Sequence, residues 1–212
     1  IQVFFLILGG IVTTYLALDT VSGGEGVIEG FKTIYNAVPE KFDMILDKSN
    51  PEYNNLPGLG VLIGGMWVAN IYYWGFNQYI IQRTLAAKSL KESQKGILFA
   101  AGLKMIMPLI IVIPGIAAYV IVNDPQILSS LGDSALANIP GEGANDKSYP
   151  WLMQFLPTGL KGIAVAALAA AIVSSLASML NSTGTIFTMD IYRQTFNKNA
   201  SEKQMVTTGR IS

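Results

Sequence analysis

The stretch from Gly159 to Ser178 is long enough to cross a bilayer as a helix, yet it consists mostly of Ala, Gly and Ser. Leu and Ile would suit a helix that faces lipid, whereas small residues suit a helix pressed against other helices. Small residues recur here at every fourth position, at Gly162, Ala166, Ala170, Ser174 and Ser178. The pattern predicts a membrane helix that is buried within a bundle.

The composition of the whole chain agrees with a membrane protein. Apolar residues make up 51% and charged residues 13%, whereas soluble domains carry about 25% charged residues. The formal net charge is zero, which excludes nucleic acid as a partner. The chain contains no Cys and no His, so thiolate or imidazole metal sites, Cys nucleophiles and His-based triads are excluded.

Hydrophobic segments alternate with polar stretches, which predicts an all-α, polytopic membrane protein with about four transmembrane helices. The helices are expected at about 1–19, 56–82, 97–122 and 151–182, with outer loops at 20–55 and 123–150, a cytoplasmic link at 83–96 and a cytoplasmic tail at 183–212. The chain opens within a hydrophobic segment, without Met or a charged leader. It is therefore expected to be an internal fragment of one longer transmembrane domain.

The basic residues set the orientation of these segments. The link and the tail are rich in Lys and Arg, whereas acidic residues outnumber basic ones in both long loops. Because basic residues mark cytoplasmic segments, the link and tail are expected inside and the loops outside. The fourth helix then runs inward, and Ser174 and Ser175 lie past its midpoint, toward the cytoplasm.

The second hydrophobic segment carries polar residues at helical spacing. Asn70, Tyr73, Trp74 and Asn77 lie at i, i+3, i+4 and i+7, which places amide, phenol and indole groups on one stripe. An amide can donate to and accept from sugar hydroxyls, and a flat ring can cover the apolar face of a sugar. The alternative is an interfacial aromatic belt, with Asn70 bonding between helices.

Lys104 lies about 10 Å inside the third segment if that segment begins at Ile97. One interpretation is a cation or hydrogen-bond donor that faces a polar cavity. The other is a lysine that extends its stem to the membrane surface. The residues alone leave both interpretations open.

Ala171, Ser174 and Ser175 share one face of the small-residue helix. Two hydroxyls and nearby carbonyl oxygens are hard, neutral donors, which suit a singly charged hard cation better than a divalent ion. Coupling-ion sites of transporters use helix oxygens in this way. The alternative is that both serines bond back to the carbonyl four residues earlier and have no further role.

The same helix resembles a known protein family. The hallmark helix of the solute:sodium symporter family is similar to the stretch Pro157-Thr-Gly-Leu-Lys-Gly-Ile-Ala-Val-Ala-Ala-Leu-Ala-Ala-Ala-Ile-Val-Ser-Ser-Leu-Ala-Ser, followed by Asp190-Ile-Tyr-Arg193. The stretch Asn70-Ile-Tyr-Tyr-Trp-Gly-Phe-Asn-Gln and Lys104 are similar to the sodium–sugar symporters within that family. The resemblance covers the whole chain.

The resemblance implies a leucine-transporter-like fold of two inverted five-helix repeats in the cell inner (plasma) membrane. It implies sodium-coupled symport of galactose or glucose, and no enzymatic activity. Asn70 and Lys104 would contact the sugar, and Tyr73 would be an aromatic gate on its cytoplasmic side. Sodium would bind the Ala171 carbonyl and the oxygens of Ser174 and Ser175. The other ligands would come from the remaining transmembrane helices of the same protein.

Three alternatives remain at this stage. One is a symporter of the same family for another solute, such as an amino acid, a vitamin or an anion. The second is an intramembrane enzyme that uses a serine with Lys104 as its base. The third is a membrane subunit that transports nothing.

Overall fold

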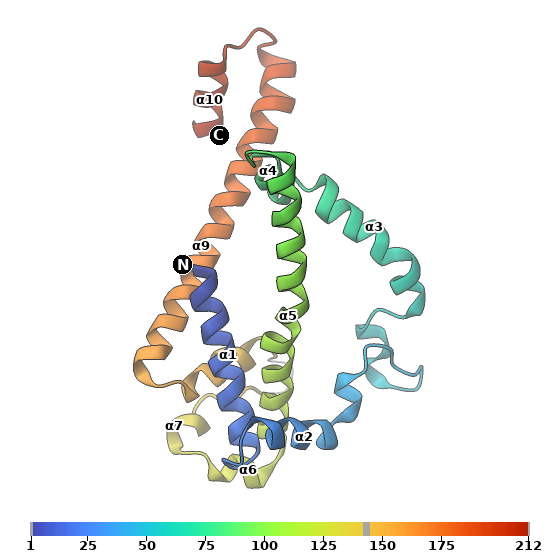
Figure 1. The fold of residues 1–212 in the computed structure, drawn as a ribbon, viewed down its shortest axis with the longest axis vertical. Coiled ribbons are helices and arrows are strands. Elements are labelled where there is room, and N and C mark those ends of the chain that lie inside the picture. Colours follow the sequence, from blue (N-terminus) through green and yellow to red (C-terminus); the bar gives the residue numbers. More distant parts are fainter. Residues whose placement is uncertain (1, 142–144, 212) are drawn as a thin grey trace. The chain divides into compact units, whose positions relative to one another are not determined.

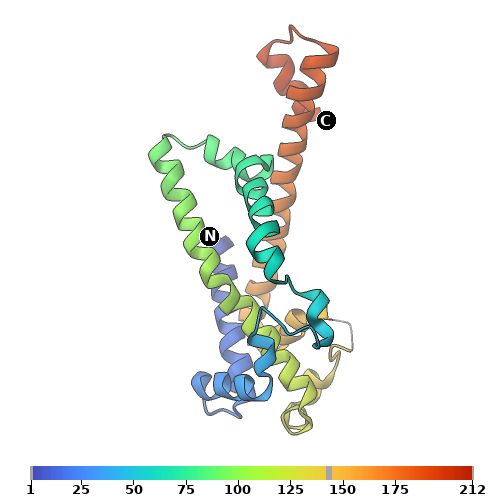
Figure 2. The same ribbon diagram turned by 90° about the vertical axis from the view of Figure 1, so that its right-hand side faces the viewer.

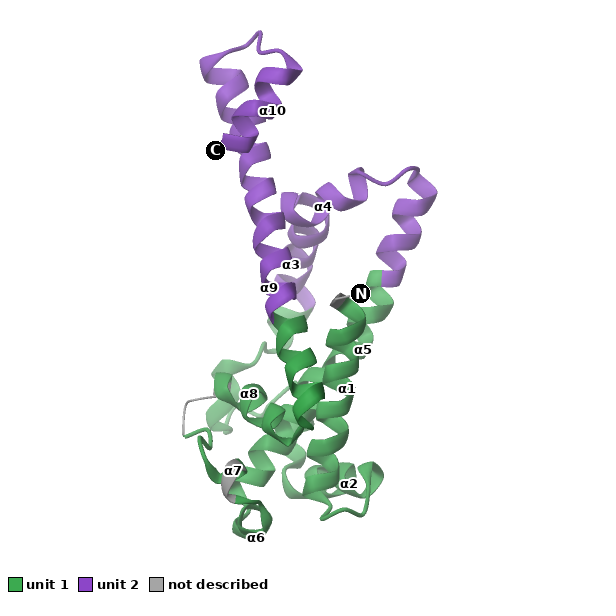
Figure 3. Cartoon of the chain, turned by 90° about the vertical axis from the view of Figure 1, so that its left-hand side faces the viewer, with its two compact units in different colours: residues 1–62, 100–168 green, residues 63–99, 169–212 purple. Residues whose placement is uncertain are grey.

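The computed structural model describes residues 2–141 and 145–211, and every regular element in that part of the chain is helical. The all-α prediction is therefore confirmed. The chain divides into two compact units, unit 1 with residues 1–62 and 100–168 and unit 2 with residues 63–99 and 169–212 (Figure 3). We describe each unit by itself.

Three helical stretches of the described chain are long and apolar enough to cross a membrane. They are Val3–Val21, within α1 (Gln2–Val21), the whole of α5 (Leu90–Asn123), and Thr158–Phe196, which joins α9 (Thr158–Ile186) to the π-helix η7 (Phe187–Phe196). They overlap the predicted segments 1–19, 97–122 and 151–182, of which residue 1 lies outside the described residues. The chain is thus part of a polytopic membrane protein.

Two of these helices begin at other positions than predicted. α5 begins at Leu90, so much of the predicted link 83–96 is helical, because its Lys, Glu and Gln residues favour helix. α9 begins at Thr158 instead of Trp151, directly after Pro157, since proline and the residue before it disfavour continuing a helix. The residues before it form the short helices α8 (Ser148–Leu152) and η6 (Met153–Phe155).

The segment predicted at 56–82 is a helix of mixed type. It consists of the π-helix η3 (Val61–Gly65), the α-helix α3 (Met66–Ile71) and a second π-helix, η4 (Tyr72–Phe76). After a break at Asn77 the chain continues as α4 (Gln78–Leu85). This segment is not among the three spans above, so a fourth membrane crossing stays a prediction.

The predicted outer loop 20–55 contains three short helices, α2 (Val27–Ala37), η1 (Pro39–Phe42) and η2 (Pro51–Asn55). The chain reverses between α1 and α2 through Gly23, Gly24 and Gly26, whose φ angles of 69°, 93° and 98° lie in the region that favours glycine. Lys41 Nζ lies 4.9 Å from the ring centroid of Tyr119 on α5. The loop is therefore folded back onto the ends of α1 and α5.

The predicted outer loop 123–150 is also largely helical, with α6 (Pro125–Ser130), α7 (Asp133–Leu136) and η5 (Asn145–Lys147). Asp124 begins α6 by accepting hydrogen bonds from the N–H groups of Gln126 and Ile127 at 2.9 and 3.3 Å. Residues 142–144 of this predicted loop lie outside the described residues.

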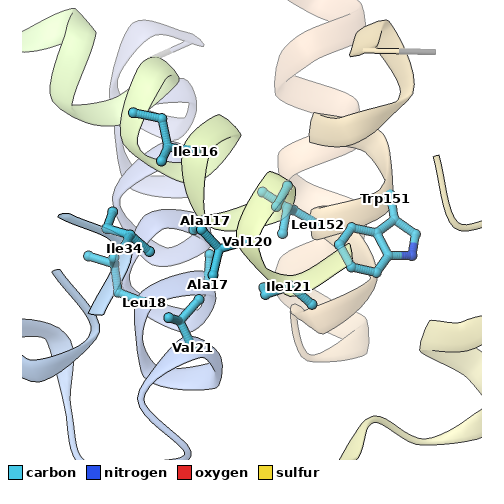
Figure 4. Close-up of a cluster of buried hydrophobic side chains, with 11 residues drawn as sticks. Ala17, Leu18, Val21, Ile34, Ile116, Ala117, Val120, Ile121, Trp151 and Leu152 are labelled. Carbon is cyan, nitrogen blue, oxygen red and sulfur yellow. The ribbon is translucent and has the colours of Figure 1, made fainter. Parts of the chain in front are cut away.

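Unit 1 has its hydrophobic core where the outer loops meet the membrane helices. α1 runs beside the C-terminal half of α5 in both views of the ribbon (Figures 1 and 2). Figure 4 shows the buried side chains between them, which come from α1, α2, α5 and α8: Ala17, Leu18, Val21, Ile34, Ile116, Ala117, Ala118, Val120, Ile121, Trp151 and Leu152. The buried Trp151 indole donates to the Ala135 carbonyl at 2.9 Å, which also fixes α7. The two predicted outer loops thus contribute to the core of unit 1.

Unit 2 ends in a pair of helices. η7 continues from α9, and α10 (Glu202–Ile211) packs back against η7 (Figure 1). The two helices approach closely at Gly209, where an added Cβ would lie 3.1 Å from Thr188 Oγ1. The predicted tail 183–212 is therefore mostly helical.

The closest helix contact in the outer region gives a test of this packing. Gly30 of α2 is buried directly against the backbone of Leu18, and an added Cβ would overlap the Leu18 carbonyl oxygen. We expect Gly30→Ala to push α2 away from α1 and lower the free energy of unfolding by about 1–3 kcal/mol. Thermal unfolding of the full-length protein in detergent measures this change. Asn36→Ala, on an exposed position of the same helix, is the control, and equal stability of the two variants would contradict the packing described here.

Candidate functional site

The residues predicted to contact a solute lie on the segment of mixed helix type. Asn70 is in α3, and its side-chain amide donates to the Met66 carbonyl four residues earlier at 2.8 Å. The Asn70 side chain is exposed in this chain. The side-chain nitrogen of Asn70 is therefore held by a hydrogen bond within its own helix, on the exposed surface of α3.

Tyr73 lies in the π-helix η4 and is partly buried. Its ring meets that of Trp74 edge to face, with the centroids 5.4 Å apart and the ring planes at 86°. This is a favoured geometry for an aromatic pair. The neighbouring indole thus helps to set the direction of the Tyr73 ring.

The predicted polar stripe is wrong at its last residue. A π-helix bonds i to i+5, so side chains beyond Ile71 no longer follow the α-helical spacing from which the stripe was predicted. Asn77 leaves the helix with φ −75° and ψ 110°, and its N–H donates to the Tyr72 carbonyl at 3.0 Å. Its side-chain oxygen accepts from the N–H of Tyr79 at 3.1 Å and caps α4. Asn77 is therefore a junction residue between η4 and α4.

Lys104 lies on the exposed surface of α5, in the part of that helix that belongs to unit 1. Asn70 and Tyr73 belong to unit 2. Contact of all three residues with one solute therefore stays a prediction.

The three residues predicted to bind sodium lie together within α9, in unit 2. Ala171, Ser174 and Ser175 are each partly buried. Because α9 is a regular helix through these positions, they lie at i, i+3 and i+4 on one face. The predicted common face of these three residues is therefore present in α9, and sodium binding to it stays a prediction.

The hydroxyl groups of α9 fall into two classes. Four of them donate to the carbonyl four residues earlier, at 2.8–3.1 Å, namely those of Ser178, Ser182, Thr183 and Thr185. Within the described part of the chain, the hydroxyls of Ser174 and Ser175 donate no such bond. The back-bonding alternative therefore describes the later hydroxyls of the helix and not this pair.

The donor set on α9 suits sodium. The two serine hydroxyls and the nearby backbone carbonyls are neutral oxygen donors, which a hard monovalent cation accepts. Among the described residues there is no group of three or more His, Cys, Asp or Glu side chains that could hold a metal ion. A divalent ion would normally require such carboxylate ligands.

A separate cavity of about 690 Å³ lies in unit 1, between α1, α5 and α9. Its lining is almost wholly apolar and includes Leu6, Met107, Ile110 and Leu168. None of the six predicted site residues lines it. Asp146, Ser148 and Tyr149 are the polar residues of a lining that is otherwise apolar, which suits a polyol poorly, so the cavity is not the candidate solute site.

Comparison with known proteins identifies the family. The model of the sodium:solute symporter family matches residues 1–212. A sodium/glucose cotransporter from Vibrio parahaemolyticus is 62% identical over all of this chain, which covers 39% of that relative. The uncharacterised symporter YidK from Escherichia coli is 35% identical over 97% of the chain, which covers 32% of YidK. The human sodium/myo-inositol cotransporter 2 is 33% identical over the whole chain, which covers 32% of that protein.

These matches confirm the family predicted from the helix around Ser174 and Ser175. The chain spans about a third of the length of the curated relatives it matches. The family model, by contrast, matches every residue of the chain. The chain belongs to the sodium:solute symporter family.

Proposed function

We propose that the full-length protein couples the inward movement of sodium to the uptake of a hexose, galactose or glucose, across the cell membrane. The most similar relative named above is a sodium/glucose cotransporter at 62% identity. Sodium and sugar are both transported substrates in this proposal. The mechanism is alternating access within a leucine-transporter-like fold, to which other helices of the protein also contribute.

The observation that carries the sodium assignment is the pair of serine hydroxyls without a partner in their own helix. Both hydroxyls are partly buried, and a hydroxyl that makes no bond within its own helix is available to another partner. We assign the Ala171 carbonyl and the Ser174 and Ser175 hydroxyls as sodium ligands. Their position past the midpoint of an inward-running helix suits release of sodium to the cytoplasm.

The sugar assignment rests on Asn70, Tyr73 and Lys104. The Asn70 amide and the Lys104 ammonium group supply hydrogen bonds to sugar hydroxyls. The Tyr73 ring, supported by Trp74 at 5.4 Å, supplies a flat surface on the cytoplasmic side of the sugar. Opening inward then requires the Tyr73 ring to move away from the sugar.

The membrane potential contributes to the driving force. Moving one elementary charge across 100 mV supplies about 2.3 kcal/mol. The sodium concentration gradient adds to this value. One sodium ion per sugar is therefore a sufficient ratio for uptake against a modest sugar gradient.

A second candidate function is sodium-coupled transport of another solute by the same site. A human relative is named a sodium/myo-inositol cotransporter, and myo-inositol also presents a ring of hydroxyl groups. Competition by unlabelled galactose, glucose, myo-inositol and amino acids against labelled galactose uptake separates these solutes. Sodium-stimulated uptake that galactose does not inhibit would contradict the sugar assignment.

The enzyme and the non-transporting subunit are less well supported. The family model and the relatives described above all carry the names of symporters or cotransporters. The non-transporting subunit gives the two serine hydroxyls no role, and the enzyme gives a role to only one of them.

The sodium ligands predict a specific change in sodium dependence. Ser174→Ala and Ser175→Ala should each raise the sodium concentration for half-maximal galactose uptake at least about tenfold, equivalent to 1.4 kcal/mol. Thr183→Val is the matched control, because the Thr183 hydroxyl is already bonded to the Met179 carbonyl at 3.0 Å. Uptake by the complete protein in sealed vesicles measures this dependence. An unchanged sodium dependence in both serine variants would exclude the assignment.

The sugar ligands predict a change in galactose dependence. Asn70→Ala should raise the galactose KM about tenfold, since it removes hydrogen bonds to the substrate. Tyr73→Leu should do the same by removing the ring, whereas Tyr73→Phe should retain most of the affinity. Asn123→Ala is the control, because the Asn123 amide also bonds to its own helix, at the Tyr119 carbonyl. Equal galactose KM values for Asn70→Ala and Asn123→Ala would contradict the assignment.

A further inference from the structure

α4 and α9 are joined by a group of polar side chains in unit 2. The Gln82 side-chain amide donates to the Ser178 carbonyl at 3.2 Å and to the Tyr79 carbonyl at 3.3 Å. The Asn181 amide donates to Gln82 Oε1 at 2.9 Å, and the Arg83 guanidinium donates to the Ser178 hydroxyl. The bonds between the two helices join residues 95, 96 and 99 positions apart in the chain.

From these contacts we propose that Gln82, Arg83, Ser178 and Asn181 form a polar latch between α4 and α9, and that this latch couples sodium binding on α9 to the sugar-binding segment that precedes α4. The inference rests on the proposed function. It assigns positioning residues, since none of the four is proposed to touch sodium or sugar.

The latch is connected to the sodium ligands through Ser178. The Ser178 hydroxyl accepts from Arg83 and donates to the Ser174 carbonyl at 3.0 Å. Ser174 lies one helical turn before Ser178, about 6 Å along the axis. A chain of hydrogen bonds thus runs from α4 to the residue whose own hydroxyl is assigned to sodium, and bonds in such chains polarise one another.

The latch is connected to the sugar segment through Asn77. α4 begins at Gln78, and Asn77 holds its first turn by accepting from the N–H of Tyr79 at 3.1 Å. The Asn77 N–H also donates to the Tyr72 carbonyl in η4, the π-helix that contains Tyr73. A shift of α4 relative to α9 therefore acts at the junction next to the aromatic gate.

Both N–H donors and the oxygen of one side-chain amide, that of Gln82, make hydrogen bonds at the latch. The Gln82 nitrogen donates twice and its oxygen accepts once. The Arg83 guanidinium lies 5.9 Å from the ring centroid of Tyr79, which positions it toward Ser178. Gln82→Leu would fill similar space without any of these bonds, so its effect distinguishes a coupling role of Gln82 from a role in helix packing.

The test measures galactose affinity of the full-length protein in saturating sodium and in choline. The ratio of the two dissociation constants reports the coupling between the sites, which usually lies between about 5-fold and 150-fold. We expect Gln82→Leu and Asn181→Leu each to reduce this ratio at least about threefold, with the affinity in choline unchanged within about twofold. The double variant should lose little more than either single one, because both changes break the same hydrogen bond.

Ser178 provides a second, independent pair of variants. Ser178→Ala removes the hydroxyl between Arg83 and Ser174 and should also reduce the ratio, whereas Ser178→Thr retains a hydroxyl and should restore it. Thr183→Val, whose hydroxyl bonds only within α9, is the control and should leave the ratio unchanged.

Three results would contradict the coupling role of the latch or the proposed function. An unchanged ratio in folded Gln82→Leu and Ser178→Ala would overturn the latch, and so would an equal loss of affinity with and without sodium, which indicates only a packing role. If Gln82→Leu does not fold, the Ser178 pair decides. If the unchanged protein binds galactose equally in sodium and choline, the proposed function fails, and the coupling role of the latch with it.

Discussion

A chain in the hydrocarbon of a membrane must satisfy its backbone hydrogen bonds internally, and the rest of this structure depends on that constraint. It explains why the three membrane spans are continuous helices, including α5, which passes through Pro108 and Pro114. It also makes departures from regular bonding informative. Such departures include the π-helices η3 and η4 on either side of Asn70, the π-helix η7 after α9, the break at Asn77, and the serine pair on α9.

The hydrophobic core of unit 1 is formed by other residues than those proposed to bind sodium or sugar. The core of unit 1 is formed where α2 and the outer loops cover the ends of α1 and α5, and none of the assigned sodium or sugar residues belongs to it. Unit 2 contains Asn70, Tyr73 and the sodium ligands, and there α4 and α9 are joined by polar side chains. Polar contacts between helices are weaker than a packed apolar core, which would suit elements that move in the proposed transport cycle.

The sequence predicted the helical class, the three long spans and the placement of Ser174 and Ser175 on one face, because a regular helix has a fixed period. It failed at Asn77, because the prediction assumed a regular α-helix and the π-helix Tyr72–Phe76 changes that period. The predicted start of the fourth segment at Trp151 was wrong, because Trp151 packs into the core of unit 1 from the short helix α8 and α9 begins only after Pro157. The link from Gln82 to Ser178 spans 96 positions, a distance over which periodicity carries no information.

The central claim is that sodium binds the Ala171 carbonyl and the Ser174 and Ser175 hydroxyls, and a density map of the full-length protein determined in sodium and again in choline tests it most directly. The account predicts a peak in contact with these three oxygens that is present in sodium and absent in choline. A sodium-dependent peak elsewhere, with the two serine hydroxyls bonded to carbonyls of their own helix, would contradict it.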